Sequence, residues 1–255
     1  MGPALYREWR LVLTALGYFT RWPVSGAGEF SQVELNAALR YFPAIGLLVG
    51  ACSGFAHLLA AQIFPASVAV VLALVSGVLL TGGFHEDGLA DTCDGLGGGW
   101  TRERVLEIMK DSRLGSFGAL GLVLVLLGKY AALTSLALTI VPAVFIAGHA
   151  WSRFMAASVV STQSYVREDD SARARLVAGG IGLSALGYAG LFALAPLFLL
   201  GAAGVAGALA AFAARAIAGT YLHRRLGGYT GDTLGAVQQV AELAFYLGVL
   251  GWGVA

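Results

Sequence analysis

Charge is scarce in this sequence of 255 residues: Asp, Glu, Lys and Arg together make up 12%, against roughly a quarter in soluble domains. Five long stretches contain none of these residues, namely 41–85, 114–128, 130–152, 176–214 and 243–255. About twenty apolar residues suffice to cross a bilayer, and the mean hydropathy of the chain is +0.76. The scarcity of charge excludes a soluble globular domain and predicts an integral membrane protein.

Other features are missing as well. The apolar stretches do not alternate with polar residues, which excludes a transmembrane β-barrel. The chain does not open with a charged segment, a short apolar core and a small-residue cleavage site, so we expect no removable signal peptide. Lys and Arg are spread over several loops and the net charge is +1, which argues against a nucleic-acid partner. With only Cys52 and Cys93 available, we expect no disulfide.

The apolar stretches predict an all-α fold, a polytopic membrane bundle of about seven transmembrane helices that forms a single domain over 1–255. The expected crossings lie at about 41–63, 66–84, 115–135, 138–160, 176–196, 198–219 and from 234 to the end. The segment 1–40 is interrupted by charges and is expected to form an interfacial helix and a loop. The 36 glycines favour close helix packing in a bilayer and are compatible with a homo-oligomer.

Three charge-rich loops separate the predicted hairpins, at 85–113, 165–175 and 221–232. Hairpins of this kind place all three loops on one side of the membrane. Short loops rich in Lys and Arg stay in the cytoplasm. We therefore expect a multi-pass membrane protein whose charge-rich loops, 85–113 among them, lie on the cytoplasmic side.

The first of these loops contains four carboxylates within nine positions: Glu86, Asp87, Asp91 and Asp94. On a helix the three aspartates are spaced i, i+4, i+7 and fall within about 60° of arc, so they share one face. Such a set repels itself unless a cation neutralises it. Oxygen ligands favour Mg²⁺ first and Mn²⁺ second, and Mg²⁺ takes substrate phosphates as further ligands. The alternative is a solvated acidic loop without a metal.

The rest of this loop offers candidates for holding a diphosphate. The glycine run that begins at Gly95 is too rich in glycine to continue a helix, and it would form either a phosphate cradle or a flexible turn. Thr101 is expected to cap a short amphipathic helix. Lys110, Asp111 and Arg113 suit either a pyrophosphate grip or an ordinary surface ion-pair cluster.

A few polar residues inside or beside the predicted crossings are the remaining candidates. Arg153 lies deep in an apolar span and should face the bundle interior, because an unpaired guanidinium in lipid is costly. Arg215 and Lys129 raise the same expectation, although Lys129 is expected to snorkel to the interface. Asp232, with Thr230 beside it, is either a helix N-cap or a ligand.

Six separated motifs, spread over nearly the whole chain, resemble those of a known family. They are FTRWPVS (19–25), FPAIGLLVG (42–50), TGGFHEDGLADTCDGLGGG (81–99), VLEIMKDSRLGSFG (105–118), SYVRED (164–169) and GGYTGDTLGA (227–236). The family is that of the cobalamin synthases, the adenosylcobinamide-GDP ribazoletransferases. The resemblance implies that a hydroxyl of α-ribazole, or of its 5′-phosphate, attacks the cobinamide-linked phosphorus of adenosylcobinamide-GDP and that GMP leaves, with Mg²⁺ as the metal.

The resemblance, taken with the residue chemistry, assigns roles to individual positions. The metal ligands would be Asp87, Asp91, Asp94 and Glu86. The substrate contacts would come from Lys110, Arg113, Arg153, Gly95 and Thr230. The candidate general bases are Asp111, His85 and Asp232, in that order. The lipid bilayer and other corrinoid-assembly enzymes would be the remaining partners.

Other classes of protein share parts of this pattern. DTCDG at 91–95 matches half of the signature of the CDP-alcohol phosphotransferases, but the rest of that signature is absent from the sequence, so we regard that family as a mechanistic relative. A secondary transporter would also cluster carboxylates, although here they lie at the end of a span and no inverted repeat is evident. A non-catalytic membrane scaffold is the third alternative.

Overall fold

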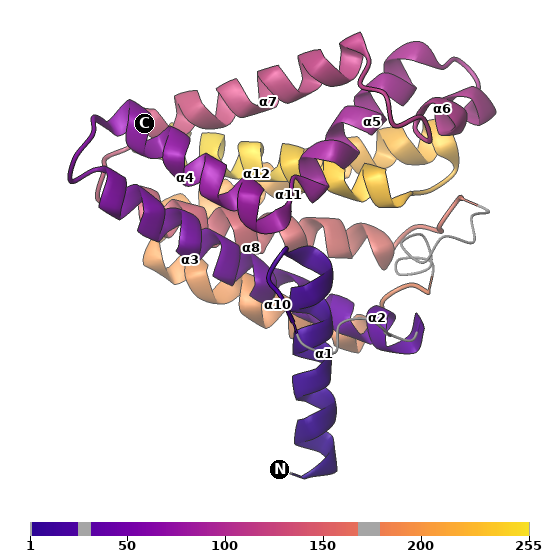
Figure 1. Ribbon diagram of the computed structural model, residues 1–255, viewed down its shortest axis with the longest axis horizontal. Coiled ribbons are helices and arrows are strands. Elements are labelled where there is room, and N and C mark those ends of the chain that lie inside the picture. Colours follow the sequence, from indigo (N-terminus) through magenta and orange to yellow (C-terminus); the bar gives the residue numbers. More distant parts are fainter. Residues whose placement is uncertain (1, 25–31, 168–178, 255) are drawn as a thin grey trace.

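The computed structural model describes residues 2–24, 32–167 and 179–254 and consists of helices joined by short turns (Figure 1). The helices in chain order are α1 (Pro3–Phe19), α2 (Gln32–Ala38), α3 (Phe42–Ala60), α4 (Ala66–Thr81), α5 (Phe84–Gly98), α6 (Arg102–Ile108), α7 (Ser116–Thr134), α8 (Val141–Val160), α10 (Leu183–Leu194), α11 (Ala202–Leu226) and α12 (Gly231–Val254). Two 3₁₀ turns, Leu39–Tyr41 and Ala195–Leu199, precede α3 and follow α10. The described residues form no strand, so the all-α prediction is confirmed.

Five helical segments are long and apolar enough to cross a membrane, which confirms a multi-pass bundle. They are Val33–Ala60, Ser116–Thr134, Val141–Val160, Ala202–Leu226 and Gly231–Gly253. The bent pair α4 and α5 makes a sixth if it is counted as one span, and the apolar segment Leu183–Leu199 is shorter. The described chain thus has five or six long spans where we expected about seven. The 12 residues of α10 rise by only about 18 Å, short of a hydrocarbon core of about 30 Å.

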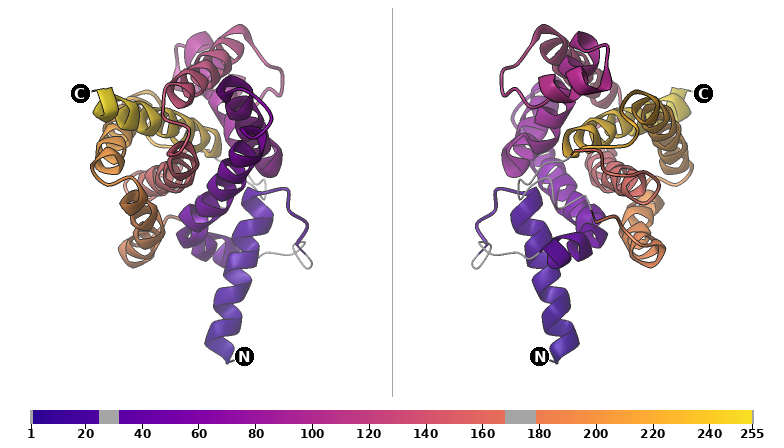
Figure 2. Two further views of the ribbon diagram at one scale, coloured as in Figure 1. Left: turned by 90° about the vertical axis from the view of Figure 1, so that its left-hand side faces the viewer. Right: turned by 90° about the vertical axis from the view of Figure 1, so that its right-hand side faces the viewer.

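The N-terminal region differs from the expectation in its limits. The first long span begins at Val33 rather than at 41, because α2 and the following turn lead directly into α3. Helix α1 runs across the direction of the bundle helices, and its N-terminal end projects away from them (Figure 2). Leu5, Tyr6 and Trp9 on this helix are more than half exposed. An exposed apolar face of this kind is what an interfacial helix requires.

Glycines bring α3 and α8 into backbone contact. Gly46, Gly50 and Gly54 recur every fourth residue and all face α8. A Cβ atom at Gly50 would lie 2.5 Å from the carbonyl oxygen of Phe145, so no larger residue fits there. This is the close helix approach predicted from the glycine content, and it is the usual way to gain packing energy in lipid.

A sharp bend separates α4 from α5. Gly82 and Gly83 have φ angles of +70° and +69°, a left-handed conformation that glycine adopts without strain. The two helices meet at 90°. The acidic segment after the bend is therefore a helix of its own, turned away from the direction of the apolar helix before it.

One expectation about this segment is wrong: α5 does not end at the glycine run but continues through it to Gly98. Glycine costs about 1 kcal/mol in a helix relative to alanine, but tertiary packing outweighs this cost here. The side chain of Met109 occupies the place where a Cβ of Gly95 would lie. The predicted cap of α6 is confirmed, because the Thr101 hydroxyl accepts a hydrogen bond from the amide of Arg104 at 3.3 Å.

The charged connections meet at one end of the bundle. Arg225 donates to the carbonyl of Gly99 at 2.8 Å and Arg102 to that of Val166 at 3.5 Å. Tyr165 forms a backbone bridge with Tyr229. The turns between α3 and α4 and between α7 and α8 lie at the opposite end (Figure 1). This confirms that the described parts of the charged loops share one side of the molecule.

Candidate active site

The face of α5 that carries Asp87 and Asp91, called the acidic face below, packs against the start of α12. Gly88 makes this contact, since a Cβ atom there would lie 2.7 Å from the carbonyl oxygen of Asp232. Asp87 is exposed, and Asp91 and Asp232 are half-buried. Asp232 and Asp87 both lie close enough to Asp91 for their charges to act on it. Three carboxylates from two helices therefore converge at the charged end of the bundle.

One arginine lies beside these carboxylates. Arg167 forms an ion pair with Asp232, with 2.8 Å between Nη2 and Oδ2. The same Nη2 atom donates to the carbonyl of Met109 at 3.1 Å. Arg167 is only partly exposed and is held by two different elements. It offers a fixed positive charge at the edge of the acidic face.

Asp94 is engaged differently from the other two aspartates of α5. One carboxylate oxygen accepts from the amide of Gly115 at 2.7 Å and the other from that of Gly118 at 2.8 Å. These amides belong to the start of α7, which lacks intrahelical acceptors for them. Asp94 thus caps α7 from a neighbouring helix, and the negative charge suits the positive end of the α7 dipole.

The side chains on this face are carboxylates, the oxygen ligands that hard divalent ions prefer. Within the described chain, no group of three His, Cys, Asp or Glu residues is arranged to hold a metal ion by itself. Mg²⁺ is commonly held by one or two carboxylates, with waters and phosphate oxygens completing the octahedron. Asp87 and Asp91 supply carboxylate oxygens four residues apart on one helix face, and Asp232 adds a third nearby. This set fits Mg²⁺ better than it fits an ion that needs a complete protein cage.

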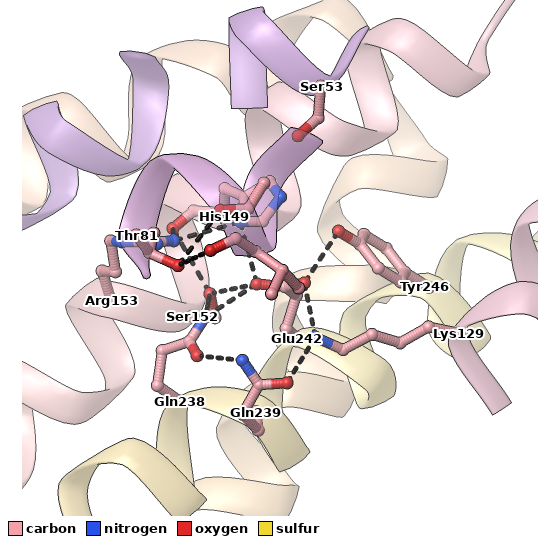
Figure 3. Close-up of polar contacts among 12 residues, drawn as sticks. Ser53, Thr81, Lys129, His149, Ser152, Arg153, Gln238, Gln239, Glu242 and Tyr246 are labelled. Carbon is pink, nitrogen blue, oxygen red and sulfur yellow. Dashed lines mark hydrogen bonds and ion pairs between the residues drawn. The ribbon is translucent and has the colours of Figure 1, made fainter. Parts of the chain in front are cut away.

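A second polar cluster is buried inside the bundle and centres on Glu242 of α12 (Figure 3). Its carboxylate is 1% exposed. It accepts from Lys129 and Gln238 at 2.7 Å and from Tyr246 at 3.1 Å, and it lies 3.0 Å from Nδ1 of His149. A carboxylate with this many donors is fully satisfied, as a charge in lipid must be.

The three basic residues of the predicted crossings differ in their burial and in their partners. Arg153 is 1% exposed and faces the bundle interior, as predicted. Its Nη1 donates to the carbonyl of His149 at 3.0 Å. Lys129 was expected to snorkel, and this is wrong: it is 2% exposed and pairs with Glu242, whose charge makes the interior favourable for it. Arg215 is partly buried and donates to Ser158 and Thr162.

Glu86 and His85 point into the bundle rather than along the acidic face. Oε1 of Glu86 accepts from Gln239 at 2.9 Å. His85 is 2% exposed and stacks on the ring of Phe42. Arg153, predicted as a phosphate contact, borders the same internal cavity as Glu86 and His85. All three therefore lie behind the acidic face.

Asp111 and Arg113 form the surface ion pair that was the alternative to a pyrophosphate grip. Arg113 donates to both carboxylate oxygens of Asp111, at 3.0 Å from Nε and 2.5 Å from Nη2. These hydrogen bonds lower the pKa of Asp111 to about 2. Lys110 beside them is exposed. A carboxylate with so low a pKa is a weak base at neutral pH.

Gly95 and Thr230, both predicted substrate contacts, are buried and contribute to the helices in which they lie. Gly95 is buried within α5, so its backbone belongs to the helix. Thr230 is fully buried and exchanges hydrogen bonds with Thr233, amide to hydroxyl in both directions, at 2.8 Å and 3.2 Å. This reciprocal pattern caps α12. Thr230 is therefore the cap of α12, and the carboxylate of Asp232 pairs with Arg167 instead.

Sequence reasoning missed several residues of these clusters, and Glu242, Gln239 and Arg167 are the most informative of them. Glu242 is the one acidic residue of the last crossing beyond Asp232, and an ionisable residue in such a span is a signal in itself. Gln239 is three positions before it and would lie on the same helix face. Arg167 stands inside the SYVRED motif, where nothing local indicates that it reaches α12.

The comparisons with known proteins agree with one another. A family model described as cobalamin-5-phosphate synthase matches residues 11–250. A relative from Shewanella frigidimarina, named adenosylcobinamide-GDP ribazoletransferase, is 45% identical over 255 residues, which cover 98% of this chain and 97% of the relative. A relative of the same name from Shewanella amazonensis is 48% identical over 249 residues, 96% of each chain. No solved structure matches the chain. The chain belongs to the cobalamin-5-phosphate synthase family.

Proposed function

We propose that this chain is a membrane transferase that joins α-ribazole, or its 5′-phosphate, to adenosylcobinamide-GDP and releases GMP. The assignment of this reaction rests on the family of the chain and on the name of its relatives. The structural observation that supports it is the convergence of Asp87 and Asp91 with Asp232 and Arg167 at the charged end of the bundle. In the reaction, the ribazole hydroxyl oxygen bonds to the cobinamide-linked phosphorus, the bond from that phosphorus to the bridging oxygen breaks, and GMP leaves.

Asp87 and Asp91 would hold Mg²⁺ at this site. A bound Mg²⁺ would neutralise negative charge on the diphosphate oxygens. Asp94 would contribute less than the sequence suggests, because both of its oxygens accept hydrogen bonds from α7. The donor chemistry supports this assignment, and Mn²⁺ is the second choice.

Arg167 takes the place of Arg153 as the cation for phosphate. Phosphoryl transfer depends mainly on positioning and on offsetting charge. Arg167 lies beside the acidic face and already binds a carboxylate, and a guanidinium binds phosphate oxygens with the same fork geometry. Arg153 is buried behind the face.

Asp232 is the best placed of the three candidate bases. It pairs with Arg167 beside Asp87 and Asp91, whereas Asp111 pairs with the exposed Arg113 and His85 is buried. The carboxylate of Asp232 would accept the proton of the ribazole hydroxyl as the new bond forms.

We further propose that the charged end faces the cytoplasm, where short loops rich in Lys and Arg remain, and that the membrane is the prokaryotic inner membrane. Adenosylcobinamide-GDP carries a charged diphosphate and α-ribazole carries polar hydroxyl groups, so both substrates would reach the site from water. Homo-oligomer formation and association with other corrinoid-assembly enzymes remain predictions from the sequence.

The decisive test uses the full-length protein in nanodiscs with adenosylcobinamide-GDP, α-ribazole and Mg²⁺. We expect joined product and GMP in equal amounts, only when both substrates are present, and loss of both when the metal is chelated. Folded protein that yields no joined product would refute the proposal. Ion flux through proteoliposomes without GMP release would support a transporter instead.

A further inference from the structure

Glu86 is adjacent to Asp87 in the chain, yet its side chain joins a different set of contacts. Gln239 donates from Nε2 to Glu86 and accepts from Nζ of Lys129 at 2.7 Å through its own oxygen. Lys129 in turn pairs with Glu242. A continuous chain of hydrogen bonds therefore runs from Glu86 on α5 through Gln239 on α12 to Lys129 on α7. Figure 3 shows its part from Gln239 to Lys129 and Glu242.

A small cavity provides a second link from Glu86 to the interior. The cavity has a volume of about 20 Å³ and is lined by His85, Glu86, Arg153 and Gln239, among others. Three buried polar atoms of these residues have no hydrogen-bond partner within the described chain: Nε2 of His85, Oε2 of Glu86 and Nε of Arg153. A cavity of this size holds one water, which needs two to four polar partners. One water here would join the carboxylate to the guanidinium.

The charges of the cluster balance only if Glu86 is counted. Lys129 and Arg153 carry two positive charges, and Glu242 supplies one negative charge. Glu86 supplies the second, and it acts electrostatically on Arg153. An unpaired buried cation is strongly destabilising. The same two cations oppose the approach of a divalent ion to Glu86.

Holding the Glu86 side chain in place also fixes the rotation of α5 about its axis, and with it the direction in which Asp87 and Asp91 point. Successive residues of a helix are 100° apart, and residues i and i+4 lie within about 40° of each other. With Glu86 held inward, Asp87 and Asp91 are turned together toward Asp232. Resting on the metal role of α5 in the proposed function, we propose that Glu86 is a positioning residue: its bond to Gln239 sets the rotation of α5 that aims Asp87 and Asp91 at the divalent ion, and Glu86 itself is not a ligand.

The test uses four variants of the full chain in nanodiscs: Glu86→Gln, Gln239→Met, the exchange Glu86→Gln with Gln239→Glu, and Gln163→Met. The exchange keeps the total charge, a hydrogen bond between positions 86 and 239, and an acceptor for Lys129. Gln163→Met is the matched control, because this partly buried glutamine bonds the carbonyl of Gly219 away from α5. Mn²⁺ affinity is measured by electron paramagnetic resonance, and kcat is measured as a function of Mg²⁺ concentration.

We expect Gln239→Met to weaken Mn²⁺ binding about tenfold, the scale of one lost hydrogen bond to a charged group. Its kcat at saturating Mg²⁺ should stay within about twofold of wild type, because displaced carboxylates weaken the binding of the ion but leave the ion-bound enzyme active. The exchange should bind Mn²⁺ at least about threefold more tightly than Glu86→Gln, and Gln163→Met should match wild type.

Two results would overturn the inference alone, with wild type binding Mn²⁺ normally. One is wild-type Mn²⁺ affinity in folded Gln239→Met. The other is an exchange variant that binds no more tightly than Glu86→Gln, as expected if the carboxylate at 86 is itself a ligand. If Gln239→Met does not fold, the comparison of Glu86→Gln with the exchange decides. Wild type that binds no Mn²⁺ would instead refute the metal role in the proposed function, and the inference with it.

Discussion

Neighbouring carboxylates of α5 have different environments although they share a sequence motif. Asp91 faces other carboxylates, Asp94 faces the amides of α7, and Glu86 faces the bundle interior. The partner across the helix interface decides which oxygens remain available to an ion. At the scale of single residues, this separates a carboxylate that faces other carboxylates from one that caps a helix and from one that faces buried cations.

The substitution Asp91→Asn removes a charge and keeps the side-chain shape. We expect kcat/KM to fall by about 10²-fold or more, the usual scale for losing one electrostatic contact to the reacting group, while the protein remains folded. Glu103→Gln is the control, because this acidic residue lies on the exposed face of α6. Equal activity of Asp91→Asn and Glu103→Gln would remove Asp91 from the site.

The two candidate bases Asp111 and Asp232 are distinguished by pH. The pKa of Asp111 is about 2 in the folded protein, below the ordinary value of about 3.9, so its contribution to stability is present above pH 4 and is lost as the pH falls toward 2. Asp111→Asn should therefore leave the pH dependence of kcat unchanged between about pH 5 and 9. Asp232→Asn should lower kcat by about 10²-fold. The reverse pattern would restore Asp111 as the base.

At the scale of whole helices, caps at the helix ends and contacts between helices position the residues of the site. Asp94 supplies the cap of α7, and Thr230 with Thr233 supplies that of α12. Each of these helices starts at the charged end, so the caps fix the frame in which Asp91 and Asp232 face each other.

The cap formed by Asp94 predicts a result different from that of a metal ligand. Asp94→Ala removes two hydrogen bonds to the first turn of α7 and should lower the free energy of unfolding by about 1–2 kcal/mol. Titration with a denaturing detergent, followed by circular dichroism, measures this change. Asp94→Asn keeps an acceptor and should lose less. A large loss of Mn²⁺ affinity with unchanged stability in Asp94→Ala would make Asp94 a ligand instead.

Close packing between α3 and α8 gives a second prediction for this scale. Gly50→Leu would force a side chain into the backbone of α8, where the Phe145 carbonyl is 2.5 Å from the Cβ position. Overpacking of this kind costs about 1–3 kcal/mol or more. Gly251→Leu is the control, because a Cβ atom there meets nothing within 4 Å. Comparable unfolding midpoints for the two variants would contradict the contact.

The parts that could be predicted from the sequence are those set by local patterns. The apolar runs predicted the helical bundle, the spacing of Asp87, Asp91 and Asp94 predicted a shared helix face, and Thr101 predicted the cap of α6. The spacing did not predict that Asp94 binds the amides of α7. The misjudged parts depend on distant partners. The helix through Gly95 relies on Met109, and the burial of Lys129 relies on Glu242, more than a hundred positions later in the chain. No local pattern links Gly95 to the Met109 side chain, and no window of sequence contains both Lys129 and Glu242.

For the molecule as a whole, the buried Glu242 cluster ties three spans together. Lys129 comes from α7, His149 from α8 and Glu242 from α12. Removal of one charge leaves its partner unpaired in a low-dielectric interior, which costs more than the net worth of the pair itself.

Lys129→Met should therefore destabilise the bundle by about 3–5 kcal/mol. Replacing both charges, with Lys129→Met and Glu242→Gln together, should recover part of this loss because the remaining charges of the cluster balance again. Unfolding in a denaturing detergent measures both variants. If the double variant were less stable than Lys129→Met, charge pairing would not explain the cluster.

The turn at Gly82 and Gly83 has a consequence for how so large a substrate is handled. Since α5 departs at a right angle from the helix before it, its carboxylates can meet a diphosphate that approaches along the surface, and the corrin macrocycle can stay in water throughout. The substrate would then remain in the aqueous phase during the reaction, and the bilayer would border only the far side of the site. Such an enzyme needs no channel between its helices for a molecule of this size.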